Sequence, residues 1–176
     1  LLAFAFVIYY SAKENREKEF FTSLKKEGIT KANLIFDAKV DASTLQDIYR
    51  NNRKLLNEVE VAIYDSNFQI VYHDAVELDM VKETPEMLNE IIKNGDLQFY
   101  INDWQVIGMR YQFEGKTYAL TAAAYDQYGY NKLDSLYKTI FIVFIISIAF
   151  VYVAGRYFSN KAFAPVLEMT EKARSI

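Results

Sequence analysis

The amino-acid sequence predicts an α+β domain with a largely antiparallel sheet, packed on a long N-terminal helix and joined to a membrane. Three observations support this prediction. The apolar residues follow a helical period near the N-terminus, and the period changes to two from residue 59 onward. After residue 138 the pattern gives way to a long uncharged apolar run. The 176 residues are enough for one ordinary domain with accessory segments.

Composition excludes several classes of protein. The chain has no cysteine, so it has no disulfide framework and no thiolate metal site. Its formal net charge of −3 argues against a nucleic-acid-binding protein. The 14 tyrosines and 13 phenylalanines can supply a core, a membrane interface or a ligand pocket.

The apolar run has the sequence TIFIVFIISIAFVYVAG over residues 139–155, between Lys138 and Arg156. At the helical rise, these two charges lie roughly 27 Å apart, which is close to the thickness of the hydrocarbon core of a bilayer. We therefore predict a transmembrane helix over residues 138–158, with a buried core helix as the alternative. Aromatic residues suited to the membrane interface lie near its ends: Tyr137, Tyr152, Tyr157 and Phe158.

The first ten residues, LLAFAFVIYY, are also uncharged and apolar. Ten helical residues reach only about 15 Å, half of a bilayer. We interpret residues 1–12 as the end of a first, truncated transmembrane helix. The core of a cleaved signal peptide is the alternative, but the following residues SAKENREKEFF are good helix formers without a small-residue cleavage pattern.

The basic residues predict the orientation. The segment after the long apolar run carries four basic residues against two acidic ones. The positive-inside rule therefore places this tail in the cytoplasm and residues 13–137 outside.

The N-terminal half of that domain favours helices. Residues 13–37 predict a long helix, with apolar residues at helical spacing, although Gly28 is an alternative C-terminal cap. Ser43 and Gln46 form a capping-box pair for a short second helix that ends at Asn51 and Asn52.

Strands follow, because the apolar period becomes two. Residues 59–64 and 69–73 predict strands joined by the turn Asp65-Ser66-Asn67-Phe68. A helix is predicted after these two strands, with Thr84 as N-cap, Pro85 at the first helical position and Gly95 past its end. Three more strands are expected at residues 97–101, 104–113 and 116–124.

One face of the strand 104–113 has the composition of a pocket wall, because it carries Trp104, Gly108 and Arg110. The small residues 122–124 on the next strand leave space for a ligand or for a closely packed helix. We expect nearby tyrosines to line the same cavity. The predicted ligand-binding residues are Arg110, Trp104, Tyr100, Tyr118, Tyr125 and His73.

His73 is the single histidine and precedes Asp74 at the end of a predicted strand. It is a candidate ligand or pH-sensing group, and the alternative is a half-buried histidine that closes the strand. The acidic segment 74–90 is a possible cation site, because calcium-like cations prefer oxygen ligands. A solvated loop and helix N-terminus explain the same charges. The residues proposed for a cation are Asp74, Glu77, Asp79 and Glu83, with no firm metal site.

Known catalytic patterns are absent from the sequence. It contains no HExxH, phosphate-loop or nucleophile-elbow motif, so we expect no catalytic residue in this chain.

The last residues have the spacing of a narrow coiled-coil seam. After Pro165, apolar residues follow at steps of three, four and three. The predicted signalling seam consists of Pro165, Val166, Met169, Ala173 and Ile176. Two heptads do not form a stable helix alone, so the seam predicts a dimeric helical partner.

The order of elements, with its hairpin AIYDSNFQIVYHD, resembles the PAS-like, Cache-type extracytoplasmic sensor domain of bacterial sensor histidine kinases over residues 1–137. The tail 159–176 resembles the start of a HAMP linker, with valine and methionine in place of the usual pair of leucines.

This resemblance implies a homodimer in the bacterial inner (cytoplasmic) membrane, the sensing part of a two-component system. It implies ATP and Mg²⁺ in a kinase domain, a cytoplasmic response regulator as partner and no cofactor in this segment. The alternatives are the front end of a chemoreceptor or nucleotide-cyclase-type receptor, or a membrane-anchored extracytoplasmic binding protein. The resemblance also implies an extracytoplasmic ligand as a partner.

Overall fold

The computed structural model describes residues 2–52, 59–75 and 79–174, with side chains up to Lys161. The chain divides into two compact units. One is the domain Lys13–Tyr130, and the other combines residues 1–12 with residues 131–176.

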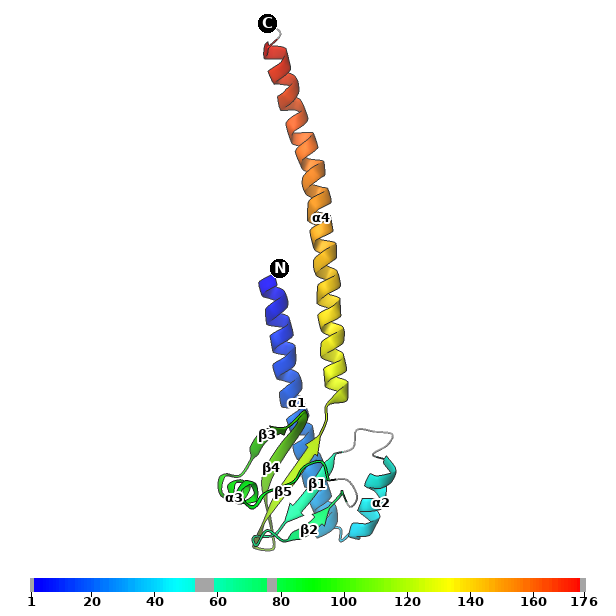
Figure 1. Cartoon of the computed structure of the whole chain (residues 1–176), viewed down its shortest axis with the longest axis vertical. Coiled ribbons are helices and arrows are strands. Elements are labelled where there is room, and N and C mark those ends of the chain that lie inside the picture. Colours follow the sequence, from blue (N-terminus) through cyan, green and yellow to red (C-terminus); the bar gives the residue numbers. More distant parts are fainter. Residues whose placement is uncertain (1, 53–58, 76–78, 175–176) are drawn as a thin grey trace. The chain divides into compact units, whose positions relative to one another are not determined.

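The domain is built on a five-stranded sheet in the order β2-β1-β5-β4-β3, in which all neighbouring strands are antiparallel (Figure 1). This confirms the predicted α+β class and the predicted antiparallel sheet. The observed strands match the predicted ones to within one residue: β1 (Glu60–Tyr64), β2 (Ile70–His73), β3 (Leu97–Ile101), β4 (Trp104–Phe113) and β5 (Lys116–Ala124).

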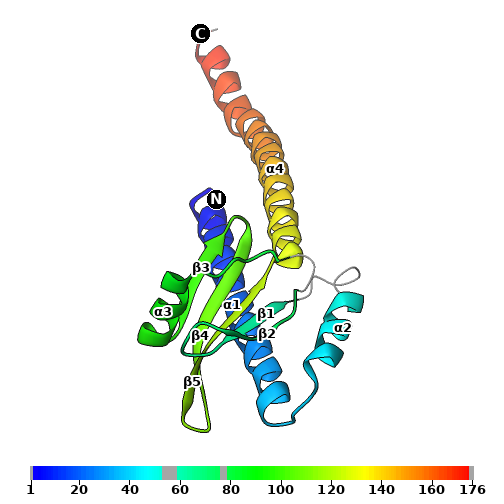
Figure 2. The same ribbon diagram turned by 60° about the horizontal axis from the view of Figure 1, so that its bottom comes forward.

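The long helix α1 (Leu2–Phe36) packs on one face of this sheet (Figure 2). Gly28 allows the close approach, because a Cβ at this position would lie 2.8 Å from Met109 Cε and 3.2 Å from Ala122 Cβ. A helix and not a ligand therefore occupies the space beside Ala122. Gly28 lies inside α1, so the alternative of a shorter helix that ends at this glycine is wrong.

The opposite face is covered by α3 (Pro85–Asn94), whose predicted ends are confirmed. The Thr84 hydroxyl accepts a hydrogen bond from the Met87 N–H at 3.3 Å. Gly95 has a φ of 88° and donates its N–H to Ile91 O at 2.9 Å. Such a positive φ is strained for residues with a Cβ, which explains the glycine at this end.

The short helix α2 (Ala42–Asn52) is present, but its predicted cap is wrong. Asp41 caps the helix, because its carboxylate accepts the Ser43 N–H at 3.1 Å and also the Ser43 hydroxyl. Gln46 makes no capping box and instead donates to the carbonyl oxygen of His73 at 2.9 Å. The capping-box pattern therefore located the helix but misplaced its N-cap by two residues.

A buried ion pair joins α1 to the first two strands. Lys31 Nζ donates to Asp74 Oδ2, and the two residues are 7% and 2% exposed. The Val61 N–H donates to Asp74 Oδ2 at 2.8 Å, and the Tyr72 hydroxyl donates to Asp74 Oδ1. Burial, followed by the hydrogen bond to Asp74, raises the pKa of Tyr72. Both carboxylate oxygens are therefore hydrogen-bonded, as a buried charge requires.

The second unit contains most of α4 (Gln127–Arg174), an unbroken helix. Its segment up to Lys161 is long and apolar enough to cross a membrane and has no buried residue in its most apolar stretch. α4 continues through Pro165, the first residue of the predicted signalling seam. Ile176 lies outside the described residues, and the side chains of the rest of the predicted seam are not described.

The prediction of two membrane helices is supported only in part. Among the described residues, α4 alone is long and apolar enough to span a bilayer. The apolar residues 2–12 form the start of α1, which then continues into charged residues at Lys13 and Glu14. Eleven helical residues cover only about half a bilayer, which explains why this segment is not itself a candidate span.

Gly108 provides a test of how the sheet and α3 fit together. Its Cβ would lie 2.4 Å from both Cγ1 and Cδ1 of Ile91, which is fully buried. We expect Gly108→Ala to lower the free energy of unfolding by about 1–3 kcal/mol through overpacking. The fluorescence of Trp104, the single tryptophan, reports unfolding in denaturant.

The matched control is the same substitution in an Ile91→Ala background. This background is itself destabilised by its cavity, but it leaves room for the new methyl group. Gly108→Ala should then cost much less, so that the two changes are non-additive. Equal costs in the two backgrounds would contradict the packing described here.

Candidate functional site

The sheet separates the residues predicted to line one ligand pocket. Tyr118 is buried on the α1 side, with its ring 4.6 Å from that of Phe36. Tyr100 lies on the same side and donates its hydroxyl to Glu17 Oε1 at 2.8 Å. Burial, followed by this hydrogen bond, raises the pKa of Tyr100. These two tyrosines therefore hold α1 to the sheet.

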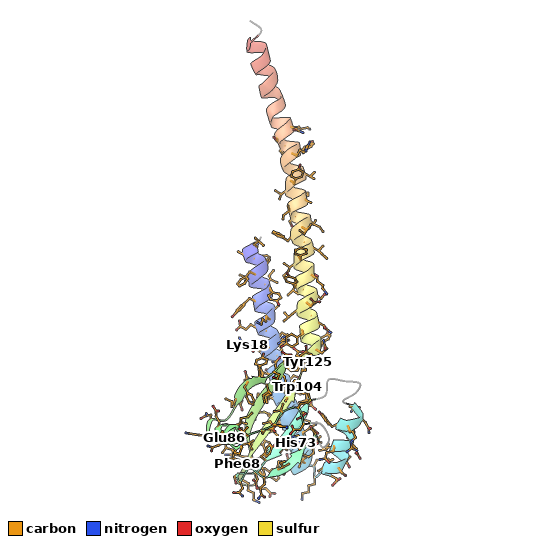
Figure 3. All side chains as sticks on the ribbon, in the orientation of Figure 1. Lys18, Phe68, His73, Glu86, Trp104 and Tyr125 are labelled. Carbon is orange, nitrogen blue, oxygen red and sulfur yellow. The ribbon has the colours of Figure 1, made fainter. Side chains whose placement is uncertain are left out.

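Trp104 and Arg110 lie on the opposite face (Trp104 is labelled in Figure 3). Trp104 packs against the small apolar cluster around Val106, and Arg110 is exposed and donates Nη1 to Ile92 O at 3.3 Å. The space above Gly108 is filled by Ile91. Tyr125 follows β5 and stacks on Tyr130 at a centroid distance of 5.3 Å. Trp104 and Arg110 therefore lie on the sheet face opposite Tyr100 and Tyr118, and the role of all these residues in ligand binding stays a prediction.

Polar groups gather instead where β1 and β2 meet the segment that begins at Asp79. Potential ligand atoms of Glu60, His73 and Asp79 all lie within 4.8 Å of one another, and we call these three residues the acid–histidine cluster. His73 stands opposite Ala62 in the β1–β2 register, and the strand alternation places Glu60 on the same face. Figure 3 labels His73 in this part of the domain.

Glu60 is the most buried member of the cluster, with 2% of its surface exposed. Its Oε2 accepts the Met80 N–H at 3.4 Å, whereas Oε1 has no hydrogen-bond partner among the described residues. Burial, with the nearby Asp79 and Glu83 carboxylates, raises the pKa of Glu60 to about 7. A buried carboxylate oxygen without a partner is costly and marks an unusual site.

His73 is held in one orientation by the backbone. Its Nδ1 accepts the Ala75 N–H at 3.0 Å, so the proton of the neutral ring lies on Nε2. Nε2 lies 3.9 Å from Asp79 Oδ1, beyond hydrogen-bond distance. The imidazole therefore turns its Nε2 edge toward the carboxylates without contacting them.

Glu83 lies beside the cluster but is already satisfied. Its Oε2 accepts the Tyr64 hydroxyl at 2.9 Å, and its Oε1 accepts the Thr121 hydroxyl at 2.5 Å. Burial, followed by the Glu83 charge, raises the pKa of Tyr64. Glu83 thus fastens the segment after Asp79 to β1 and β5.

The structure rearranges the predicted cation site. Asp79 and Glu83 each lie close enough to Glu60 to raise its pKa. Asp74 is excluded, because it is buried in the ion pair with Lys31, and Glu77 lies outside the described residues. Sequence reasoning missed Glu60, although a charged residue at the start of the apolar strand VEVAIY was a usable signal.

A second polar group lies where α4 begins. Asp126 is its N-cap, because Oδ1 accepts the Gly129 N–H at 2.7 Å. Arg16 of α1 places Nη1 3.3 Å from Asp126 Oδ2 and donates Nη2 to Gln105 Oε1 at 3.1 Å. The guanidinium also lies 4.2 Å from the centre of the Tyr130 ring. We call Arg16, Gln105, Asp126 and Tyr130 the junction cluster; it links α1, β4 and α4.

No protein-family model, curated protein or solved structure matches this chain.

Gly129 tests the junction cluster. Its Cβ would lie 2.0 Å from Asp126 Oδ2 and 2.7 Å from Arg16 Cδ, so Gly129→Ala must displace the cap or the arginine. We expect a loss of about 1–3 kcal/mol in stability and faster hydrogen exchange in the first turn of α4.

The matched control is Gly155→Ala in the same helix, where no atom lies within 4 Å of the added Cβ. This change should leave thermal unfolding in detergent nearly unaltered. If both glycine substitutions have the same effect, the close packing around Asp126 is refuted.

Proposed function

We propose that the chain is the signal-sensing and membrane-spanning part of a two-component sensor histidine kinase. The main support for this proposal is the continuity of α4. The helix begins at an Asp126 cap inside the folded domain and continues without a break through the uncharged apolar stretch. Its 48 residues correspond to roughly 70 Å, more than twice the hydrocarbon core of a bilayer.

The junction cluster supports a role in transmission. Arg16 lies on α1 and Asp126 caps α4, so a change in the packing of α1 acts directly on the first turn of α4. Both residues are largely buried, which makes the ion pair sensitive to small displacements. A ligand transmits a signal if it binds one arrangement better, and tenfold preference corresponds to about 1.4 kcal/mol.

Contacts within the unit of residues 1–12 and 131–176 favour a second membrane segment beside α4. The Tyr9 ring of α1 lies edge-on to the Tyr137 ring of α4 at a centroid distance of 6.4 Å. Apolar side chains of both helices line a groove between them: Leu2, Ala3, Ala5, Phe6, Tyr9, Tyr137 and Ile140. Many apolar side chains of both segments are exposed in the protein alone, as expected for lipid-facing residues.

The strand order β2-β1-β5-β4-β3 and the long helix on one face support the PAS-like part of the proposal. In this proposal the sensor is a homodimer in a bacterial inner membrane, with the domain outside and a HAMP linker inside. ATP and Mg²⁺ then belong to the kinase domain, which phosphorylates a response regulator.

Topology is tested with single cysteines, since the natural chain has none. Ser66 lies in an exposed turn of the domain, and Ser159 is exposed beyond the apolar stretch. An impermeant thiol reagent on intact cells should label Ser66→Cys only, and permeabilised cells should show both. Labelling of Ser159→Cys alone would reverse the orientation and refute an extracytoplasmic sensor.

The kinase assignment is tested separately in membranes that hold the full-length protein. With ATP and Mg²⁺, the protein should acquire an acid-labile, alkali-stable phosphate on a histidine. Methyl acceptance or cyclic-nucleotide synthesis in its place would replace the kinase by one of the other receptor classes.

A further inference from the structure

We propose that Glu60, His73 and Asp79 bind a divalent transition-metal ion of the Zn²⁺ or Mn²⁺ type. The site itself is independent of the output domain. The role of the metal ion as the sensed signal rests on the proposed sensor function.

The ligand atoms of the three residues lie at distances that suit one shared cation. Their ligand atoms lie within 4.8 Å of one another, so some point lies within about 2.8 Å of all three. Zinc bonds to nitrogen and carboxylate oxygen measure about 2.0–2.2 Å. Side-chain movements of roughly 0.7 Å therefore suffice to bring all three atoms into coordination distance.

Glu60 provides an independent observation that points to a bound cation. Its carboxylate is nearly fully buried, and Oε1 has no hydrogen-bond partner among the described residues. Glu83 cannot satisfy this oxygen, because its own carboxylate oxygens are acceptors, and both receive hydroxyl groups. A cation at the centre of the cluster would satisfy Oε1 and compensate the neighbouring acidic charges.

The donor set indicates the class of metal. One imidazole nitrogen and two carboxylates suit Zn²⁺ and Mn²⁺, whereas Ca²⁺ and Mg²⁺ take oxygen ligands almost exclusively. Asp79 is exposed, so water can complete the coordination sphere from that side.

Metal binding at His73 requires a change of tautomer. Nε2 must give up its proton to coordinate, and the neutral ring then carries the proton on Nδ1, which at present accepts the Ala75 N–H. Binding therefore breaks this backbone hydrogen bond. The loss of one hydrogen bond is small beside the binding free energy of a tight zinc site.

This exchange connects the metal to α1. Ala75 directly follows Asp74, and the Asp74 N–H donates to Val61 O at 3.0 Å while its carboxylate holds Lys31. A metal that releases Ala75 thus alters the segment that anchors α1 to the sheet.

The purified chain in detergent, treated with a chelator and dialysed, provides the test. Titration with Co²⁺ should produce visible d–d absorption with one ion per chain, and Zn²⁺ should displace it. Glu60→Gln, His73→Gln and Asp79→Asn should each weaken binding at least tenfold. The control Asp103→Asn, in an exposed turn, should bind like the natural protein. Trp104 fluorescence confirms that each variant is folded.

Because the chain has a single histidine, ¹⁵N-histidine NMR observes this ring alone. Without metal, the proton should lie on Nε2, and with Zn²⁺ it should lie on Nδ1. Absence of stoichiometric Co²⁺ or Zn²⁺ binding, or binding that the three substitutions leave unchanged, would overturn the site.

The signalling role is distinguished by the full-length protein in membranes. Phosphorylation that changes with Zn²⁺ in the natural protein, but not in His73→Gln, supports the metal as signal. Metal binding without any change in output supports the site and refutes the signalling role. A response to Zn²⁺ that His73→Gln leaves unchanged also refutes it.

Discussion

The buried pair between Lys31 and Asp74 is the interaction on which the rest of the domain depends. It lies where α1, α2, β1 and β2 meet, with Lys31 Nζ also 5.2 Å from the centre of the Tyr49 ring. Two charges removed from water are tolerated only if their hydrogen-bonding capacity is met. Here Tyr72, the Val61 N–H and the Val59 carbonyl oxygen complete the pair. These partners fix the rotation of α1 as well as its position.

The same helix carries Arg16, the central residue of the junction cluster. Fifteen residues separate Arg16 from Lys31, or roughly 22 Å along the helix. Between them, the helix packs closely against the sheet at Leu24 and Gly28. A helix held at two polar points and packed tightly between them transmits displacement along its axis, because packed cores resist continuous deformation. The acid–histidine cluster lies next to the Lys31–Asp74 pair, because His73 directly precedes Asp74 in the chain.

Local signals explain what the sequence predicted well. Thr84, Pro85 and Gly95 specify the ends of α3 through chemistry confined to a few residues, and the period of two located all five strands. The cap of α2 was missed because Asp41 and Ser43 are both good N-caps and only the backbone geometry decides between them. The partners of Asp74, Glu60 and Asp126 lie up to 110 residues away, so no local spacing reveals them. Strand alternation and register place the predicted pocket residues of β3, β4 and β5 on two faces of the sheet, which their spacing within one strand does not reveal.

A double-mutant cycle on Lys31 and Asp74 tests the central claim most directly. Lys31→Met and Asp74→Asn should each lower the free energy of unfolding by about 3–5 kcal/mol, because each leaves a buried charge unpaired. The double variant should lose clearly less than the sum. The exposed pair Lys25 and Asp96 serves as the matched control and should lose at most about 1 kcal/mol. Small, additive losses at Lys31 and Asp74 would contradict the account, because the pair would then not anchor α1.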